Sequence, residues 1–262
     1  MRITIIQPDI VWADPAANRK KLNDLILPLE DTGLVVLPEM FSTGFVTEPE
    51  GTAEQSGESL HWMKELSKIK GFAIAGSIAE KSEEKYFNRF HFVMPNSTDT
   101  TYDKHHLFTY SGEHLKFTGG QKRTVVQWQG MRFLLQICYD LRFPVFSRNT
   151  MHGGIPEYDA IIYAASWPEK RSAAWKTLLK ARAIENQCFV IGVNRVGNDP
   201  GNVYSGDSVI LAPDGSTIAC AEPYRESVIS GELDPELLMR MRDGFPVLED
   251  ADRFSLEKGN MR

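Results

Sequence analysis

The strongest constraint on the fold is an alternation of short apolar runs with longer helix-like segments. The apolar runs are rich in Ile, Val and Phe, and their length is typical of β-strands. They occupy residues 3–6, 33–37, 72–78, 89–94, 124–128, 131–137, 160–166, 188–194 and 227–233. The helix-like segments occupy residues 15–29, 58–68, 143–152, 172–185 and 235–241. This order predicts a layered α/β fold.

Some apolar runs follow one another with no helix between them, near residues 86–103 and 124–137. We expect antiparallel hairpins there, one of them turning at Gln129 and Gly130, and therefore mixed sheets. No linker rich in Gly, Ser or Pro interrupts the pattern, so residues 1–262 are expected to form one domain. From about residue 245 the sequence is polar and aperiodic, which predicts a tail that packs on a partner or frays.

Composition narrows the possible functions. The net charge of −6 gives no support to nucleic-acid binding, so a small organic substrate is expected. Cys138, Cys188 and Cys220 are widely spaced, which favours neither a disulfide framework nor a zinc site. The first apolar run is too short for a signal peptide, and no later run has the length of a membrane span. We therefore expect a cytoplasmic protein.

One cysteine lies where an apolar strand meets an aromatic and basic turn, in "LLQICYDLRFP". Cys138 is either a small buried hydrophobe or a nucleophile. If a helix begins in "RFPVFSRN", its first amides point toward the thiol and, with a nearby lysine, favour the thiolate. The N–H of Tyr139 could then bind an oxyanion. Cys188 and Cys220 lie in or beside apolar strands and are expected to be structural.

Two acidic residues and a lysine also occupy positions suited to catalysis. Glu39 follows a strand and a proline in "GLVVLPEMF", and Phe41 indicates an apolar setting in which a carboxylate is a stronger base. Lys104 and Glu113 lie in "DKHHLFTYSGEHLKF", where a lysine could stabilise a developing oxyanion. The alternative is that Glu39 and Lys104 are ordinary charged residues at solvated surface positions.

Metal and phosphate binding are not expected. His105 and His106 are adjacent, so on one strand they would face opposite ways, and no third ligand follows at a usual spacing. The loop "VGNDPGNVYSGDS" matches no phosphate-binding pattern. The apolar stripe of the helix at 172–185 is typical of core packing or of a subunit contact.

Glu39 in "LPEMF", Lys104 in "YDKHHLF" and Cys138 in "ICYDLRFP" resemble the Glu-Lys-Cys triad of the nitrilase superfamily of carbon-nitrogen hydrolases. Their order and local contexts match, and the resemblance extends from "ITIIQPDI" to about Leu233. It implies a four-layer α-β-β-α sandwich with mixed sheets, commonly dimerised, so a homodimer is expected. It also implies catalysis without a cofactor or metal.

Within that superfamily, "CYDLRFP", "SGEH" and "KARAIENQ" are similar to the ω-amidase branch. That branch hydrolyses the terminal amide of α-keto acid amides such as α-ketoglutaramate. Glu113 matches the second glutamate of the family. Nitrilases proper usually carry tryptophan and glutamate after the cysteine, whereas this chain has Tyr139 and Asp140, which disfavours nitrile chemistry.

A pocket for such a substrate needs a cation opposite the end where the amide is cleaved. Arg142 and Lys116 are the two candidates, and a structural ion pair explains Arg142 equally well. The other residues expected to bind substrate are Tyr139, Trp167, Phe41 and Tyr110.

The resemblance also implies a mechanism. Glu39 would take the proton of Cys138, Lys104 and the Tyr139 amide would hold the oxyanion, and water would hydrolyse a thioester intermediate while Glu113 orients Lys104 or the amide. Other readings are hydrolysis of a nitrile or an N-carbamoyl compound, a Cys-His enzyme, or a non-catalytic binding protein on the same fold. None of the six histidines can be paired with Cys138 from the sequence.

Overall fold

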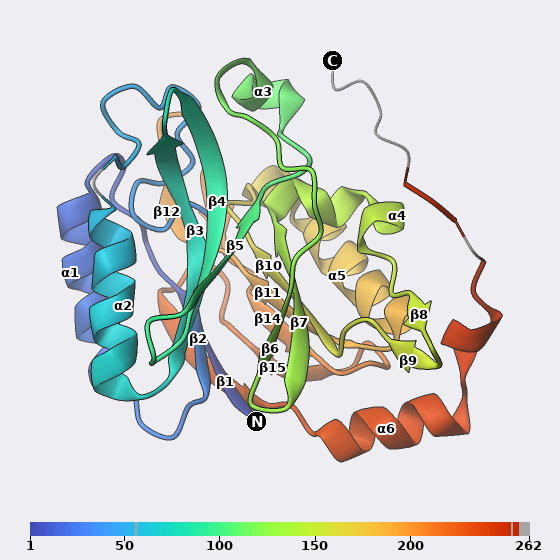
Figure 1. Ribbon diagram of the computed structural model, residues 1–262. Helices are drawn as coiled ribbons and strands as arrows, with labels where there is room; N and C mark the ends of the chain where they lie inside the picture. Colours follow the sequence, from blue (N-terminus) through green and yellow to red (C-terminus); the bar gives the residue numbers. More distant parts are fainter. Residues whose placement is uncertain (56, 253, 257–262) are drawn as a thin grey trace.

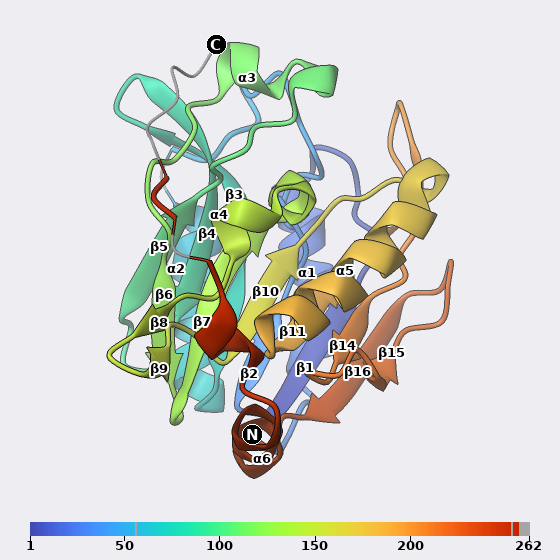
Figure 2. The same cartoon turned by 90° about the vertical axis from the view of Figure 1, so that its right-hand side faces the viewer.

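The computed structural model describes residues 1–55, 57–252 and 254–256, and it contains two six-stranded sheets that pack face to face (Figures 1 and 2). The first sheet has the order β16 (Ser227–Glu232), β1 (Arg2–Gln7), β2 (Leu34–Val36), β3 (Ala73–Ser82), β4 (Lys85–Val93) and β5 (Asp99–Asp103). The second has the order β15 (Thr217–Cys220), β14 (Val209–Leu211), β11 (Phe189–Val193), β10 (Ala160–Ala164), β7 (Met131–Ile137) and β6 (Val125–Trp128).

Helices form the outer layers, as Figure 1 shows with α1 and α2 on one side and α5 on the other. The helices are α1 (Pro15–Ile26), α2 (Glu58–Lys70), α3 (Glu113–Lys116), α4 (Pro144–Ser147), α5 (Ser172–Asn186) and α6 (Pro235–Gly244). Buried residues of α1 and α2 pack on one face of the first sheet, and those of α5 pack on the second sheet. The predicted four-layer α-β-β-α sandwich is confirmed.

The innermost layer is an apolar core between the two sheets. Its members come from alternate positions of β1, β2, β3 and β4 on one side and of β7, β10 and β11 on the other, as strands with a period of two require. The rings of Phe92 and Phe133 meet across this layer with centroids 6.1 Å apart. The two sheets are therefore held together by apolar side chains that both of them contribute.

Both sheets are mixed, as the sequence predicts. β1, β2 and β3 are parallel, as are β7, β10 and β11, and antiparallel strands flank each group. The expected hairpin joins β6 to β7, and Gln129 (φ 44°) and Gly130 (φ 81°) both adopt the left-handed conformation of a type I′ turn. The parallel strands bring several chain segments together at their carboxyl ends.

Two sequence-based expectations are wrong in this part of the fold. The helix expected at 143–152 is the single turn α4, because Arg148 already leaves the helical path with ψ of 130° and the Asn149 side chain donates to the Tyr158 carbonyl at 3.0 Å. The chain then forms β8 (Met151–His152), which pairs with β9 (Ile155–Pro156). The loop after β11 contains an unexpected hairpin of β12 (Val196–Asn198) and β13 (Val203–Ser205).

The C-terminal segment is partly packed. Residues Val247–Asp250 form a 3₁₀ turn whose Leu248 is buried. The rest of the expected tail includes residues 253 and 257–262, which lie outside the described residues. Over the part of the chain that the structure describes, no helix combines the length and the hydropathy needed to cross a membrane.

Candidate active site

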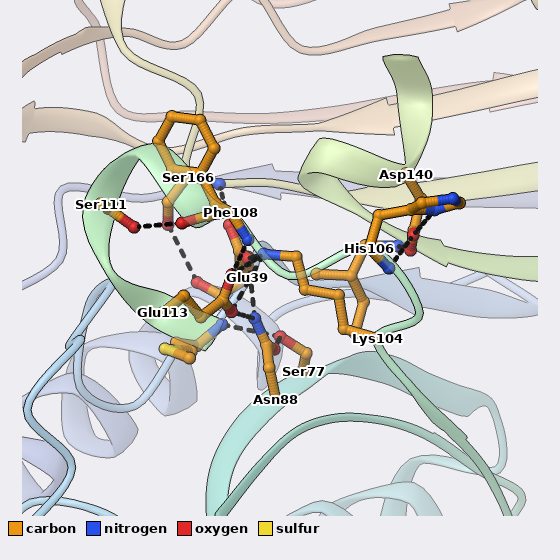
Figure 3. A network of polar contacts seen from close by, with 12 residues as sticks. Glu39, Ser77, Asn88, Lys104, His106, Phe108, Ser111, Glu113, Asp140 and Ser166 are labelled. Carbon is orange, nitrogen blue, oxygen red and sulfur yellow. Dashed lines mark hydrogen bonds and ion pairs between the residues drawn. The ribbon is translucent and has the colours of Figure 1, made fainter. Parts of the chain in front are cut away.

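Glu39, Lys104 and Glu113 form a fully buried charge cluster at the ends of strands in the first sheet (Figure 3). The Lys104 Nζ donates to Glu39 Oε1 at 2.8 Å and to Glu113 Oε2 at 2.9 Å, with a longer contact of 3.1 Å to Glu113 Oε1. The Phe108 N–H donates to Glu113 Oε2 at 2.6 Å. One ammonium therefore faces two carboxylates, and all three side chains are buried from solvent.

These three side chains come from three chain segments, and local backbone geometry directs each of them into the cluster. Glu39 follows β2, where Pro38 ends the strand and Met40 takes a positive φ of 45° that turns the chain back. Lys104 follows β5 directly, and Glu113 is the first residue of α3. Gly112, with φ of 83°, makes the sharp entry into α3 that returns Glu113 toward Lys104.

Cys138 enters the same site from the second sheet, at the carboxyl end of β7. Its φ of 42° is unusual for a residue other than glycine and marks a tight strand-to-turn junction. A 3₁₀ turn (Cys138–Arg142) follows in place of the expected α-helix. Cys138 therefore projects from a sharp turn, in reach of the Glu39 carboxylate.

The electrostatics of Cys138 reverse one expectation from the sequence. The pKa of its thiol is well above the ordinary value, because burial and the Glu39 carboxylate raise it more than Lys104 and the Ser166 N–H lower it. The prediction of an easily ionised thiol is therefore wrong. At neutral pH Cys138 is a thiol beside a carboxylate, so it needs a base to become a nucleophile.

The pKa values of Lys104 and Glu113 are both raised in this cluster of two acids and one cation. Burial alone would lower the pKa of Lys104, but the charges of Glu113 and Glu39 raise it, so Lys104 stays an ammonium. Burial raises the pKa of Glu113, and the nearby Glu39 charge raises it further, while Lys104 lowers it. A buried acid with a raised pKa beside a cation, at the edge of a cavity, marks a candidate functional site.

Asn88 and Ser166 are site residues that the sequence reasoning missed. Asn88 Nδ2 donates to Glu39 Oε1 at 2.8 Å and to Glu113 Oε1 at 3.1 Å, and its Oδ1 accepts from Ser77 Oγ at 2.9 Å (Figure 3). The Ser166 N–H donates to Glu39 Oε2 at 2.9 Å. Asn88 lies at the position that shares a strand face with Phe90 and Phe92, and this polar residue in an apolar alternation is the signal that could have identified it.

A cavity of about 240 Å³ opens beside Cys138 and Lys104. Four of the predicted substrate-binding residues line it, namely Tyr110, Tyr139, Arg142 and Trp167. The Arg142 guanidinium lies 4.8 Å from the centroid of the Trp167 ring. The cavity is also lined by residues that were not singled out from the sequence, including Trp12, Phe45, Phe108, Arg171 and Asp199.

The structure does not bring Phe41 and Lys116 to this cavity, so both expectations need correction. Phe41 is fully buried in the core under α2, with its ring centroid 5.8 Å from that of Trp62, because the turn at Met40 sends it away from Glu39. Lys116 lies on the surface, where Nζ pairs with Glu50 at 2.7 Å and Glu48 at 3.2 Å.

The histidine pair lies beside the site rather than in the cavity. His105 and His106 are past the end of β5, so they do not face opposite ways as expected, and their ring centroids are 4.5 Å apart. His105 stacks on Phe146, and His106 stacks on Phe143 and contacts Asp140. Within the described residues no cluster of three metal-ligating side chains is found, and no histidine is among the residues lining the cavity.

The carbon-nitrogen hydrolase family model matches residues 2–243, so the chain belongs to the carbon-nitrogen hydrolase family. "Omega-amidase YafV" of Yersinia enterocolitica is 42% identical over 257 residues, which cover 98% of each chain. "2-oxoglutaramate amidase" of Bacillus subtilis is 32% identical over 253 residues, which cover 95% of this chain and 96% of that relative. The chain is therefore an amidase of the nitrilase superfamily.

A solved structure supports the same placement. It is a CN-hydrolase superfamily protein of Xanthomonas campestris with an arsenic adduct in its active site. It matches this fold with a TM-score of 0.95 at 40% sequence identity, covering 98% of this chain and 99% of that chain.

Proposed function

We propose that this amidase hydrolyses the terminal carboxamide of short α-keto acid ω-amides, with α-ketoglutaramate as the first substrate to test. The observation that carries the proposal is the buried Glu39–Lys104–Glu113 cluster, which faces the Cys138 thiol at the inner end of a cavity. The cavity also holds Arg142, whose guanidinium can match a carboxylate. Relatives named for ω-amide and 2-oxoglutaramate hydrolysis support the substrate class.

In the first step Glu39 acts as the general base. Its Oε1 already accepts hydrogen bonds from Lys104 and Asn88, whereas Oε2 accepts one from the Ser166 N–H. Oε2 therefore keeps a free lone pair for the Cys138 proton. The thiolate adds to the carboxamide carbon, which moves an electron pair onto the carbonyl oxygen.

Lys104 and the Tyr139 N–H are assigned to that oxygen. Lys104 contacts both oxygens of Glu113, so one of its three protons can turn to the oxyanion while the ammonium stays anchored. Glu39 then gives its proton to the leaving nitrogen, the C–N bond breaks, and ammonia departs. A thioester to Cys138 remains.

Water completes the reaction by the same groups. Glu39 takes a proton from water, hydroxide adds to the thioester carbon, and the C–S bond breaks. The departing sulfur receives the proton, so the products are the carboxylic acid and free Cys138. Glu113 keeps Lys104 in place through both halves of the reaction.

Arg142 is the residue assigned to the far carboxylate of the substrate. Lys116 is bound to two surface glutamates outside the cavity, which removes the other candidate. Among the described residues no acidic group lies within ion-pair distance of Arg142, and its flat face rests on Trp167. A guanidinium left free of acids in a cavity is suited to a substrate carboxylate.

The decisive test is an ammonia-release assay across ω-amides, nitriles and N-carbamoyl amino acids, with intact-mass spectrometry during turnover. We expect α-keto ω-amides to be preferred and an acyl adduct to form on the peptide that carries Cys138. The Cys138→Ala variant should fold and be inactive. A preference for nitriles or N-carbamoyl compounds overturns the substrate assignment, and an adduct on another residue overturns the nucleophile.

The substrate-reading role of Arg142 has its own test. Arg142→Met should raise KM for the ω-amide about tenfold or more, since a charge-assisted bidentate contact is lost, and should change little with an uncharged amide of similar length. Equal losses on both substrates would assign Arg142 to support of the site.

We also propose a cytoplasmic homodimer built from one domain per chain. All three cysteines are free, as a reducing compartment favours. The apolar stripe of α5 cannot supply the dimer contact expected from the sequence, because Trp175 and Leu179 are buried in the core of their own chain. The dimer therefore rests on the family resemblance, and light scattering that gives only the 29.6 kDa monomer would contradict it.

A further inference from the structure

Asp140 is a fully buried carboxylate that lies two residues after Cys138. Its Oδ2 accepts from the Ile137 N–H at 2.9 Å and from the Tyr102 hydroxyl at 2.8 Å. Its Oδ1 accepts from the His106 N–H at 3.0 Å and contacts His106 Nδ1 at 2.8 Å. Figure 3 shows the Asp140–His106 contact on the side of Lys104 away from the glutamates.

These four groups come from three residues, which flank Lys104 on both sides and precede Cys138. Tyr102 precedes Lys104 by two positions and His106 follows it by two, while Ile137 precedes Cys138 directly. The Tyr102 hydroxyl also accepts from the His105 N–H at 3.1 Å, so the segment around Lys104 wraps around the carboxylate. Asp140 thus connects the segment that carries Lys104 to the turn that carries Cys138.

The reaction needs this connection to be rigid. Lys104 and the Tyr139 N–H must meet at one point, where the carbonyl oxygen of the substrate becomes charged after Cys138 adds. Those donors come from different sheets, and Cys138 holds a positive φ that its surroundings must maintain. An error of about 1 Å in such an arrangement can cost about a hundredfold in rate.

We infer that Asp140 is a positioning residue that sets the place of the Lys104 ammonium relative to the Cys138 turn, and so shapes the oxyanion site without touching substrate. The inference rests on the proposed function of Lys104 and Cys138. Each oxygen of Asp140 accepts one backbone N–H and one side-chain group. An asparagine has only one acceptor oxygen, so in either orientation its NH₂ group opposes a backbone N–H.

The chain offers a matched control in Asp159, which lies at the other end of the same strands. Asp159 accepts from the Arg132 N–H at 3.1 Å near the amino end of β7, much as Asp140 accepts from the Ile137 N–H at the carboxyl end. It is far from the cavity and is absent from its lining. Asp159→Asn therefore reports the effect of losing a buried carboxylate without disturbing the reaction.

The test compares turnover with alkylation of Cys138 by iodoacetamide, using an amide that the wild type hydrolyses. Alkylation needs the thiol and its base but no oxyanion site. We expect Asp140→Asn to lower kcat at least tenfold with little change in KM, while its alkylation rate stays within about threefold of wild type. Asp159→Asn should leave both rates unchanged, and Glu39→Gln should lower both.

Two results would overturn the inference: a kcat for Asp140→Asn within threefold of wild type, or an equal loss of turnover and alkylation. If Asp140→Asn does not fold, Tyr102→Phe replaces it, because it removes one donor to Asp140 and the acceptor for His105 and keeps the charge. That variant should lose kcat more than alkylation, and equal rates to wild type would contradict the inference. Failure of the proposed function is separate, since it would appear as a wild type that releases no ammonia from any amide.

Discussion

Two clusters of charged side chains lie at opposite ends of the parallel strands, and they are built with opposite balances of charge. At the carboxyl ends, Glu39 and Glu113 share the single cation Lys104, and all three side chains are fully buried. At the amino ends of β7 and β10, the single carboxylate of Asp159 forms ion pairs with Arg132 at 2.7 Å and with Arg242 at 2.9 Å. These three side chains keep some exposure to solvent.

The comparison shows how the balance of charge around a carboxylate separates a candidate reaction site from a structural ion pair. At the amino ends, burial would raise the pKa of Asp159, but the hydrogen bonds and charges of the two arginines lower it, so the carboxylate is fixed in its charged form. At the carboxyl ends burial raises the pKa of Glu113, and the one cation Lys104 does not offset burial together with the charge of Glu39. A raised carboxyl pKa is typical of groups that take part in proton transfer, whereas a carboxylate held charged by two cations is typical of a structural ion pair.

The sharpest test of this contrast removes the charges of the carboxyl-end cluster. Glu39→Gln and Lys104→Met should each lower kcat at least ~10²-fold, the scale for losing proton transfer or one oxyanion donor. Steady-state kinetics with circular dichroism as the check on folding would measure this. Activity within a few fold of wild type in either variant would return that residue to a structural role.

A smaller effect is expected at Asn88, which connects the two glutamates. Asn88→Ala should lower kcat about tenfold, because Glu39 Oε1 and Glu113 Oε1 both lose a hydrogen-bond donor in a buried setting. Ser77→Ala is the comparison, since it leaves the bonds from Asn88 to both acids in place and removes the donor to Asn88 Oδ1 and the acceptor of the Met40 N–H, so it should have a weaker effect. If the two variants lose activity equally, the support that Ser77 gives to Asn88 and Met40 matters as much as the bonds to the acids.

The amino-end cluster should respond in stability and not in catalysis. Asp159→Asn should lower the free energy of unfolding by about 1–2 kcal/mol, a modest value because both guanidiniums keep partial access to water. Urea titration measures the loss, and kcat should be unchanged. A large loss of kcat with normal stability would break the contrast between the two ends.

The smallest expected effect is the pH dependence of the stability difference between wild type and Asp159→Asn. Because the pKa of Asp159 is lower in the folded chain than its ordinary 3.8, its contribution is fully present above that pH and is lost as the pH falls through the lower folded value. The difference in Tm between wild type and Asp159→Asn should therefore be constant near neutral pH and shrink in acid below 3.8. A difference that grows in acid would contradict the assigned sign.

Much of the fold follows from local sequence patterns. Alternating apolar positions in the strand regions and the left-handed turn at Gln129 and Gly130 are local properties, so most strands of both sheets and the β6–β7 hairpin were predictable, whereas β14 (Val209–Leu211) and β15 (Thr217–Cys220) were not singled out. The helix expected at 143–152 was wrong because Asn149 is held by Tyr158, which lies nine positions further along the chain. Such a contact has no local signature.

The sequence by itself also pointed to Glu39, Lys104 and Cys138 as candidate site residues, because each follows a strand in a recognisable motif. Only the tertiary structure brought in Asn88 and Ser166, which contact Glu39 from 49 and 127 positions away. It also excluded Phe41 from the cavity and set the pKa of the Cys138 thiol above its ordinary value. Strand-end positions are encoded locally, whereas cavity walls, bridging hydrogen bonds and burial depend on how two separate sheets pack against each other.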